Sequence, residues 1–255
     1  MTSSSSVDSG QRVLVAVCTY NEASNVDPLL TRIKDAAPEA DILVVDDDSP
    51  DGTADRAREL DSDAGQRVRV IVRQDQRGLG GAILVAMQYA IENQYEWFVN
   101  LDADLSHDPA EIPRMLQRAI DSPGIDVVVG SRYVDGGRVD GWPPHRRWMS
   151  RLLNGFTSRL LRLPVRDASG SFRCYRVAML ADVVESMVSL RDPSQGYAFL
   201  QEVMLDLHQA GATFVEHPIT FTDRVAGTSK LSLREATRSA STVARLLTRR
   251  PPKSA

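Results

Sequence analysis

The chain has 255 residues, of which 42% are hydrophobic and 25% charged, with a formal net charge of -4. This length and composition are typical of a soluble globular protein built as one large domain. The mild negative charge argues against a general nucleic-acid binder, and we expect no nucleic-acid partner.

Apolar, β-branched runs alternate with helix-like patterns through the first half of the chain. The pattern predicts strands at 12–18, 41–46, 67–73, 96–102 and 126–130. Helices are predicted between these strands, at 25–36, 53–60, 79–92 and 109–120. This alternation indicates βαβ units, and therefore an α/β fold with a mostly parallel sheet flanked by helices in a single domain.

The alternation weakens after Gly130. A loop rich in Gly, Pro and Arg is predicted at 131–147. The elements predicted after it are a helix at 147–162, a strand within 169–177, a helix at 197–210, a strand at 213–221 and a polar loop at 222–230. Open parallel sheets bind ligands beyond the carboxyl ends of their strands. We therefore expect the second half to complete a site at that edge.

The two ends of the chain differ from its body. Residues 1–10 have no apolar core, so we predict a disordered tail and not a secretion signal. Residues 231–255 are predicted to carry a basic amphipathic helix, which leaves 11–230 as the folded domain. On a helical wheel its apolar side holds Leu233, Ala236, Ala240, Val243 and Leu247, and its basic side holds Arg234, Arg238, Arg245 and Arg249. Such a helix could lie on an anionic membrane, pack on the domain or dock on a membrane-anchored partner.

Three predicted strands end in polar clusters, at 19–22, 45–53 and 101–107, and a parallel sheet brings such ends to one edge. In the third cluster, Asp102 and Asp104 point the same way from an extended chain. Mg²⁺ and Mn²⁺ take one or two carboxylates together with substrate phosphates. The alternative is a simple helix start, but Asp108 before Pro109 already serves as the N-cap. Asp102 and Asp104 are therefore candidate ligands of Mg²⁺ or Mn²⁺.

The second cluster holds three consecutive acids, Asp46, Asp47 and Asp48. They repel one another, so at least one should have a partner. A carboxylate can accept the ring N–H of uracil or guanine, although a turn before a helix would explain one of the acids. No glycine-rich phosphate loop follows the first strand. The glycines of 77–82 follow the third strand instead, where they could contact phosphate or allow close packing.

Taken together, these segments resemble family 2 glycosyltransferases with the GT-A fold, and more narrowly the dolichol-phosphate mannose synthases. The matching segments are "TYNEASN", "VVDDDSPDGT", "RGLGGA", "DADLSHDP", "VVGSRY", "GGRVDGW", "SGSFRCYR" and "GTSKL". They follow one another in order from about residue 18 to residue 231. Each segment alone is weakly specific, but their order makes the resemblance strong.

The resemblance implies an enzyme that moves mannose from GDP-mannose to a polyprenyl (dolichyl-type) monophosphate. It implies that Asp102 and Asp104 hold the metal ion on the diphosphate and that, with Arg132, they form the catalytic set. The residues implied to bind the nucleotide sugar are Thr19, Tyr20, Glu22, Asp46, Asp47, Ser106, Arg224 and Lys230. The residues implied to meet the acceptor phosphate are Arg132, Arg146 and Ser150.

The sequence departs from the family pattern in several places. Asp48 stands where members commonly carry Asn, and Ser106 where many carry Gln, so donor contacts at Ser106 are open. Many members carry transmembrane helices near the C-terminus, whereas no stretch here reaches the ~18 apolar residues of a membrane span. We find no QxxRW segment of the kind seen in processive polysaccharide synthases, and its absence favours transfer of a single sugar.

The chemistry predicted from these residues needs no general base. A phosphate monoester has its second pKa near ~6 and is already a nucleophile at neutral pH. The arginines of 131–151 are suited to bind it, although a solvated basic loop is the alternative. We expect displacement at the sugar C1 with inversion, aided by the metal ion on the leaving diphosphate. His107 is left out of the chemistry, because a histidine at a helix start is more often a surface or a structural residue.

Three other functions stay open at this point. One is transfer of glucose or another sugar from a UDP-sugar to the same kind of lipid. Another is a nucleotidyltransferase, which usually needs the missing glycine-rich loop. The third is a non-catalytic nucleotide-sugar-binding subunit, against which the intact acidic and arginine sets argue.

Cys18 and Cys174 form no metal or redox pattern, and Cys18 lies in an apolar run. Buried thiols of this kind favour a reducing compartment. With the lipid acceptor that the resemblance implies, we expect a cytoplasmic protein, peripheral on the cytoplasmic face of a membrane.

Overall fold

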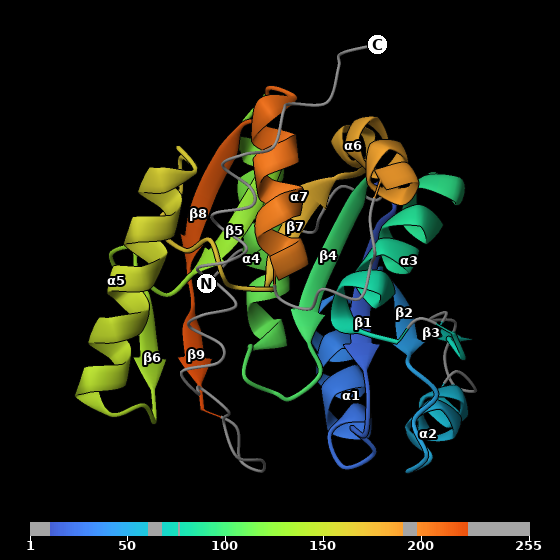
Figure 1. Ribbon diagram of the computed structural model, residues 1–255. Helices are drawn as coiled ribbons and strands as arrows, with labels where there is room; N and C mark the ends of the chain where they lie inside the picture. Colours follow the sequence, from blue (N-terminus) through green and yellow to red (C-terminus); the bar gives the residue numbers. More distant parts are fainter. Residues whose placement is uncertain (1–10, 61–67, 76, 191–197, 224–255) are drawn as a thin grey trace, which may run out of the picture.

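The computed structural model describes residues 11–60, 68–75, 77–190 and 198–223 (Figure 1). The predicted tail at 1–10, the predicted helix within 231–255 and the candidate residues Arg224 and Lys230 lie outside these ranges.

The described residues form a mostly parallel sheet of seven strands in the order β3-β2-β1-β4-β7-β5-β8 (Figure 1). The strands are β1 (Val13–Thr19), β2 (Asp41–Asp46), β3 (Val68–Val72), β4 (Trp97–Asp102), β5 (Val127–Ser131), β7 (Arg173–Arg176) and β8 (Phe214–Pro218). Within this sheet, β7 alone runs antiparallel to its neighbours β4 and β5. The predicted α/β fold with a mostly parallel sheet is confirmed.

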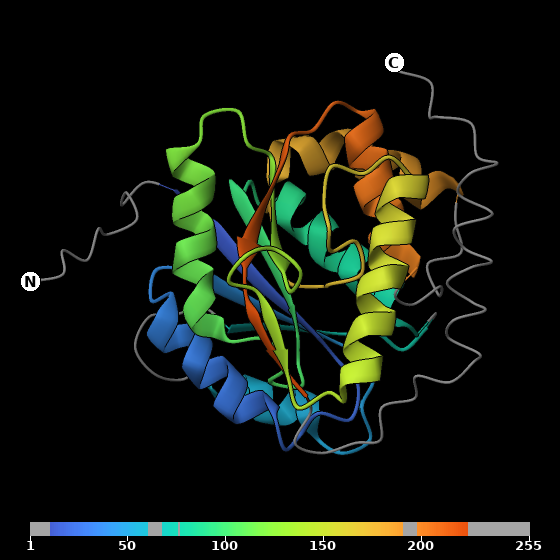
Figure 2. The ribbon, with the colours of Figure 1, turned by 90° about the vertical axis from the view of Figure 1, so that its left-hand side faces the viewer.

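Helices cover both faces of this sheet. They are α1 (Val26–Ala36), α2 (Thr53–Glu59), α3 (Leu79–Glu92), α4 (Ile112–Asp121), α5 (Pro144–Leu160), α6 (Val177–Leu190) and α7 (Ala198–Gln209). The turned view shows α1 and α4 on one face and α3, α6 and α7 on the other (Figure 2). Helix α5 stands at the outer edge of the molecule in both views.

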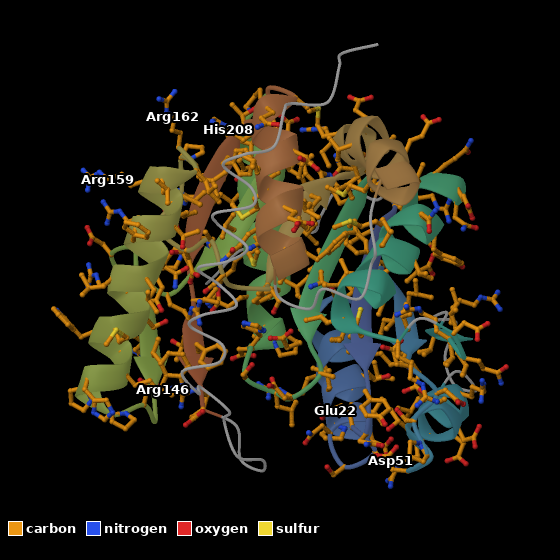
Figure 3. All side chains as sticks on the ribbon, viewed as in Figure 1. Glu22, Asp51, Arg146, Arg159, Arg162 and His208 are labelled. Atoms are coloured by element: carbon orange, nitrogen blue, oxygen red, sulfur yellow. The ribbon has the colours of Figure 1, made fainter. Side chains whose placement is uncertain are left out.

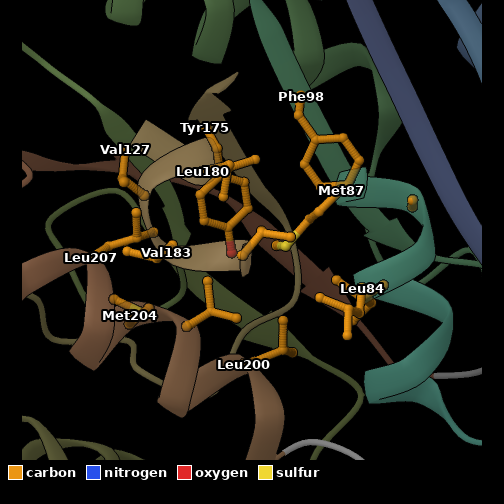
Figure 4. Packing of buried hydrophobic residues seen from close by; sticks show 14 of the residues in the cluster. Leu84, Met87, Phe98, Val127, Tyr175, Leu180, Val183, Leu200, Met204 and Leu207 are labelled. Carbon is orange, nitrogen blue, oxygen red and sulfur yellow. The ribbon is translucent and has the colours of Figure 1, made fainter. Parts of the chain in front are cut away.

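The core consists of two apolar layers, one on each side of the sheet. Successive side chains of a strand point to opposite faces, so Val15 of β1 joins the layer under α1 and α4 while Leu14 joins the other. In that second layer, Met87 of α3, Phe98 of β4 and Tyr175 of β7 pack with α6 and α7 (Figure 4). The near-continuous apolar strands of the sequence follow from this burial on two faces.

The boundaries of the predicted elements differ most after Gly130. The predicted loop contains a short strand, β6 (Arg138–Asp140), and the strand predicted at 213–221 divides into β8 and β9 (Thr220–Thr222). Strands β6 and β9 pair in parallel as a separate ribbon. Gly137 makes the preceding turn possible, because a Cβ there would lie 2.5 Å from the Ser131 carbonyl oxygen.

Three other differences concern helices. Helix α5 begins three residues before the predicted start at 147, and α6 was not predicted at all. The predicted helix at 109–120 opens with a 3-10 turn, η2 (Pro109–Glu111), before α4. The Asp108 carboxylate accepts a hydrogen bond from the Ala110 N–H and Pro109 follows it, as the N-cap prediction requires. None of the helices in the described ranges has the length and apolar character of a membrane span.

Candidate active site

The carboxyl ends of β1, β2 and β4 meet at one edge of the sheet. The parallel register sets Thr19 beside Asp46 and Cys18 beside Asp102. The acidic clusters that follow these strands are therefore neighbours, as predicted. Glu22 and Asp51, in the loops beyond β1 and β2, lie at the lower end of the molecule in Figure 3.

Asp46 links the ends of β1 and β2 at this edge of the sheet. Its carboxylate is fully buried and accepts hydrogen bonds from the Thr19 hydroxyl at 2.7 Å and from the Ser49 amide and hydroxyl at 2.8 and 2.6 Å. These bonds satisfy the buried charge and shape the turn after β2. In this structure Asp46 and Thr19 are therefore buried residues that fix the turn after β2.

Asp47 is the acid of this cluster that a buried arginine neutralises. The Arg73 guanidinium lies 2.7 Å from one of its oxygens, and the Gly78 N–H donates to the other at 2.6 Å. Both side chains of the ion pair are less than one-tenth exposed. The expected partner for these repelling acids is thus present, and the loop before α3 contacts the acid cluster directly.

Asp48 and Tyr20 form the exposed rim of the same edge. Asp48 has a positive φ of 56° and pairs with Arg77 at 2.6 Å. The Arg77 guanidinium also lies 5.9 Å from the centre of the Tyr20 ring, which is 49% exposed. An exposed aromatic ring beside a cation is suited to stack on a planar base. This placement is compatible with the predicted nucleoside contact of Tyr20.

Glu22 lies where the first loop meets the second. Its amide donates to the Thr53 hydroxyl at 3.0 Å, and its carboxylate accepts from the Asn25 side chain at 2.7 Å. Asp51 binds the same loop through the Ala23 N–H. Burial opposes ionisation of Asp51, but hydrogen bonds from Thr53 and Ala23 outweigh it and lower the pKa of Asp51. The two loops are therefore joined at the edge of the site.

Asp102 and Asp104 lie at the end of β4, with little of their side chains exposed. Asp104 accepts a hydrogen bond from the Ser106 N–H at 3.1 Å, which closes the turn around Leu105, a residue with a φ of 61°. Ser106 itself is buried. The β4 edge thus presents two carboxylates in one tight turn.

This pair fits a metal ion that depends on its substrate for further ligands. Across the residues that the structure describes, no group of three or more His, Cys, Asp or Glu side chains is arranged to hold a metal ion. Magnesium commonly takes only one or two carboxylates and completes its shell with water and substrate phosphates. The donor set of Asp102 and Asp104 is hard oxygen only, which suits Mg²⁺ or Mn²⁺.

His107 packs as a structural ring beneath this turn. It is 2% exposed and lies between Phe172 and Phe221, with ring centres 5.3 and 5.4 Å away. Burial lowers the pKa of His107, although nearby Asp102 acts in the opposite direction. A buried neutral imidazole does not act as the base of a surface reaction. The structure therefore supports leaving His107 out of the chemistry.

Strand β9 ties the acidic edge to the second half of the chain. Phe221 forms a β-bridge with His107. Its ring also contacts the Trp142 ring and the Arg132 guanidinium. The Thr222 N–H donates to the Ser106 carbonyl at 3.0 Å. Through these contacts the short ribbon of β6 and β9 is seated against the Asp102 turn.

Arg132 lies at this junction as part of a buried ion pair. Its Nε and Nη2 donate to the two oxygens of Asp167 at 2.7 and 2.8 Å, and Nη2 also donates to Ser169. Asp167 is fully buried and Arg132 is 9% exposed. The described hydrogen bonds of the side chain come from these two nitrogens. Burial opposes the charge of Arg132, but the charge and hydrogen bonds of Asp167 outweigh burial and raise the pKa of Arg132, and Asp102 adds a smaller contribution in the same direction.

Arg146 and Ser150 reach the same region from α5. The Arg146 guanidinium stacks 3.8 Å from the centre of the Trp142 ring and lies 3.4 Å from Asp223. The Ser150 hydroxyl is 2.7 Å from the Tyr133 hydroxyl. The structure thus brings the three predicted acceptor-phosphate residues, Arg132, Arg146 and Ser150, to one side of the acidic edge.

Several residues that support this site were not predicted from the sequence. Asp167 is the most consequential, because it fixes Arg132 across a separation of 35 residues. Arg73 was placed at a strand end without a role, and Phe221 in a strand. A lone Asp beside the "SGSFR" segment was the available signal for Asp167. Both thiols lie in strands as expected, Cys18 in β1 and Cys174 in β7, and burial raises the pKa of each.

Comparisons with known proteins point in one direction. The family model described as Glycosyl transferase family 2 matches residues 14–184. The polyprenol monophosphomannose synthase of Mycolicibacterium smegmatis is 40% identical over 229 residues, covering 89% of this chain and 84% of that protein. The undecaprenyl-phosphate mannosyltransferase of Micrococcus luteus is 38% identical over 223 residues, covering 87% and 88%.

A solved structure supports the fold. Glucosyl-3-phosphoglycerate synthase from Mycobacterium tuberculosis, in complex with Mn²⁺, uridine diphosphate and glucosyl-3-phosphoglycerate, superposes with a TM-score of 0.67 at 17% identity. The superposition covers 96% of this chain and 82% of the other. At this identity the similarity establishes the shared GT-A architecture alone.

Proposed function

The chain belongs to glycosyl transferase family 2, and from this premise we propose that it transfers mannose from GDP-mannose to the phosphate of a polyprenyl phosphate. The names of the two relatives support the sugar and the class of acceptor. The observation that carries the proposal is the position of Arg132, a buried cation that lies 5.4 Å from the centre of the Phe221 ring. Phe221 forms a β-bridge with His107, in the turn that follows the two carboxylates. Family membership sets aside the nucleotidyltransferase alternative.

The donor would occupy the edge formed by β1, β2 and β4. Tyr20 and Arg77 offer a planar, partly cationic surface for the base. Glu22 and Asp47 are the carboxylates we expect to accept its N–H groups, and Arg73 and Gly78 hold Asp47 in place. Asp46 and Thr19 act beneath them by fixing the turn. Ser106, buried behind Asp104, would influence the donor through the shape of that turn.

Asp102 and Asp104 would hold a divalent ion at the diphosphate. When bound, such an ion stabilises the negative charge of the leaving nucleoside diphosphate as a Lewis acid. The carboxylates contribute by fixing the position of the ion at the end of a rigid central strand, between β1 and β7. Arg224 and Lys230 remain predicted donor-phosphate contacts.

The acceptor phosphate would meet Arg132, Arg146 and Ser150. Asp167 binds Nε and Nη2 of Arg132, so the position of the guanidinium is fixed before the lipid binds. Nη1 would then be the nitrogen that donates to the phosphate. Arginine binds phosphate through its planar array of donors. The phosphate oxygen forms the new bond to the sugar C1, and the bond from C1 to the diphosphate oxygen breaks with inversion. No proton has to be removed from the dianionic acceptor.

The first test replaces one carboxylate. We expect Asp104→Asn to lower kcat by about a hundredfold or more, because charge stabilisation at the leaving group is lost. Asp108→Asn is the matched control in the same loop, since Asn also caps helices and Asp108 lies outside the carboxylate pair. Near-normal turnover of the Asp104 variant with Mg²⁺ or Mn²⁺ would remove the metal assignment.

The second test identifies the donor and acceptor. The protein is incubated with GDP-mannose, UDP-glucose or other nucleotide sugars, with and without a short polyprenyl phosphate, in the presence of Mg²⁺. We expect nucleoside diphosphate release that requires the lipid and is fastest with GDP-mannose. Faster release from a UDP-sugar would support the glucosyl alternative, and release from no donor would support a binding subunit.

A further inference from the structure

One aromatic ring joins the two halves of the proposed site. Phe221 lies in β9, the strand beside β6 (Figure 1), and its neighbours come from three separate segments of the chain. The centre of its ring is 5.4 Å from the His107 ring, 5.4 Å from the Trp142 ring and 5.4 Å from the Arg132 guanidinium carbon. The two ring pairs meet at 75° and 66°, close to the edge-to-face arrangement that aromatic pairs prefer.

The contact with His107 reaches the turn after β4, which carries the two candidate metal ligands. His107 directly follows Ser106 in this turn, and its Nδ1 lies 4.0 Å from an oxygen of Asp102. The main chain of β9 is attached to the same turn, because Phe221 forms the β-bridge with His107 and the Thr222 N–H donates to the Ser106 carbonyl at 3.0 Å. The ring therefore packs directly on the carboxylate turn.

The other two contacts reach the predicted acceptor-phosphate residues. Asp167 holds the Arg132 guanidinium through two hydrogen bonds, and the Phe221 ring lies within cation–π range of the same group. The Trp142 ring carries the Arg146 guanidinium, 3.8 Å from its centre. Phe221 thus contacts one acceptor arginine directly and supports the other through Trp142.

The main chain around Phe221 is fixed by hydrogen bonds that do not involve the ring. Strand β9 pairs in parallel with β6, where Val139 lies beside Phe221, and the Ile219 N–H donates to the Ser131 carbonyl at 3.0 Å. We therefore expect the ribbon to stay in place when the ring is changed. A substitution of Phe221 would then act mainly on the side chains packed around it.

We propose that Phe221 is a positioning residue of the transfer reaction, which sets the separation between the acceptor phosphate and the ion-bound diphosphate of the donor. This inference rests on the proposed function, because it takes the phosphate to bind at Arg132 and the ion at Asp102 and Asp104. Displacement at C1 needs the attacking oxygen about 3–3.5 Å from the carbon and correctly aligned. A residue that fixes two half-sites relative to each other contributes to this geometry more than to the affinity for either substrate.

The first measurement is a kinetic split between kcat and KM. Phe221→Leu keeps an apolar side chain but removes the flat ring between the turn and the arginines. We expect kcat to fall about tenfold to a hundredfold, because a 1 Å misplacement of reacting groups can have an effect of that size. The KM values for GDP-mannose and for a short prenyl phosphate should change little, since the residues that would bind them are unaltered. Phe221→Tyr keeps the ring and should retain most of the activity.

Phe214→Leu is the matched control. Phe214 is also partly buried in a short strand, and its ring meets the His208 ring at 6.1 Å. Figure 3 shows His208 at the opposite end of the molecule from Glu22 and Asp51. Both leucine variants lose an aromatic contact with a histidine, so both should lower the melting temperature. A lower kcat is expected for Phe221→Leu alone, and equal kinetics of the two variants would overturn the proposal.

A second measurement follows the separation without any turnover. Mn²⁺ with GDP occupies the donor edge and a short prenyl phosphate occupies the acceptor side, so the paramagnetic ion relaxes the phosphorus nucleus of the acceptor. Because this relaxation depends steeply on distance, we expect a changed rate in Phe221→Leu and an unchanged rate in Phe214→Leu. Asp104→Asn gives the background from ions bound elsewhere. The same rate in both leucine variants and the unaltered chain would show that the ribbon alone sets the separation, which would overturn the role of the ring.

The outcomes separate this inference from the proposed function. Inactivity of the unaltered chain with every donor would refute the proposed function and this inference with it. An active chain in which Phe221→Leu raises a KM and leaves kcat unchanged would make Phe221 a binding contact and overturn the positioning role. A folded Phe221→Leu variant with low kcat, near-normal KM values and recovery in Phe221→Tyr is the result that supports it.

Discussion

Helices α4 and α5 are both amphipathic, yet they face the protein with opposite sides. Helix α4 buries Ile112, Met115 and Leu116 against the sheet and exposes its arginines. Helix α5 buries small polar side chains and exposes large apolar ones. The difference follows from what lies beneath each helix. An apolar sheet face lies beneath α4, whereas the Arg132–Asp167 pair and its hydrogen-bond partners lie behind α5.

The largest expected effect comes from removing the charge that holds this polar region together. Asp167→Ala leaves the buried Arg132 cation without its bidentate partner. Breaking a buried ion pair from one side costs about 3–5 kcal/mol of unfolding free energy. Denaturant unfolding measures this, with Asp140→Ala as control, because its pair with Arg138 is exposed and worth about 0–1 kcal/mol. Equal small losses in both variants would contradict the structural role of Asp167.

The same pair should make the stability of the protein depend on pH. Burial alone would raise the pKa of Asp167, but the Arg132 charge and hydrogen bonds outweigh it, so the pKa lies below the ordinary value. A lowered folded-state pKa contributes stability that is present above the unfolded pKa of about 3.9 and is lost as pH falls through the folded value. The stability gap between the unaltered chain and Asp167→Asn should therefore be full at pH 7 and shrink below about pH 4.

The next effect compares a leucine from each helix. Leu116→Ala in α4 leaves a cavity in the core and should cost about 2–4 kcal/mol. Leu152→Ala in α5 removes a side chain that is already 49% exposed and should stay within about 0.5 kcal/mol in solution. Thermal or denaturant unfolding without lipid distinguishes them. A large loss from Leu152→Ala would mean that this exposed side of α5 is covered by protein.

Much of α4 and of the donor edge could be predicted from the sequence, because local patterns determine them. Alternating strands and helices place the ends of β1, β2 and β4 together, and Asp108 with Pro109 marks a helix start. The inverted packing of α5 could not be predicted in this way. A helical wheel reveals two unlike faces but does not say which one meets the protein. That depends on distant residues such as Asp167 and Ser169.

Other parts of the structure were not predicted because they depend on residues that are far apart in the sequence. Strand β6 has three residues in a glycine-rich segment, and it forms because β9 pairs with it from more than 80 residues away. The acidic clusters were predicted to meet, but the partners Arg73 and Arg77 come from the β3–α3 connection. The ligand roles of the individual residues stay predictions, because contacts within the protein do not identify what binds above them.

A smaller effect tests the polar side of α5 directly. Asn154→Ala removes the bonds to the Ser150 carbonyl and the Ser169 N–H in a buried position, which should cost about 1–3 kcal/mol. Asn93→Ala removes a bond of the same kind, from an Asn side chain to the Tyr89 carbonyl four residues earlier, at an exposed helix end. Its cost should be below about 1 kcal/mol. Unfolding curves of the two variants decide whether polar contacts hold α5 as apolar burial holds α4.

The smallest expected effect comes from comparing two tyrosine hydroxyl contacts, one at the site and one far from it. Tyr133→Phe removes the partner of the Ser150 hydroxyl, and Tyr95→Phe removes the partner of Asp41 at the far end of the sheet. Each tyrosine is buried, and each change should cost about 0.5–1.5 kcal/mol. If Ser150 positions the acceptor phosphate, Tyr133→Phe should raise the KM for the lipid with little change in kcat, while Tyr95→Phe leaves both unchanged. The Tyr133–Ser150 contact and the Tyr95–Asp41 contact differ mainly in location, because Tyr133 directly follows Arg132 in the chain. Identical kinetics of the two variants would therefore show that the Tyr133–Ser150 contact is purely structural.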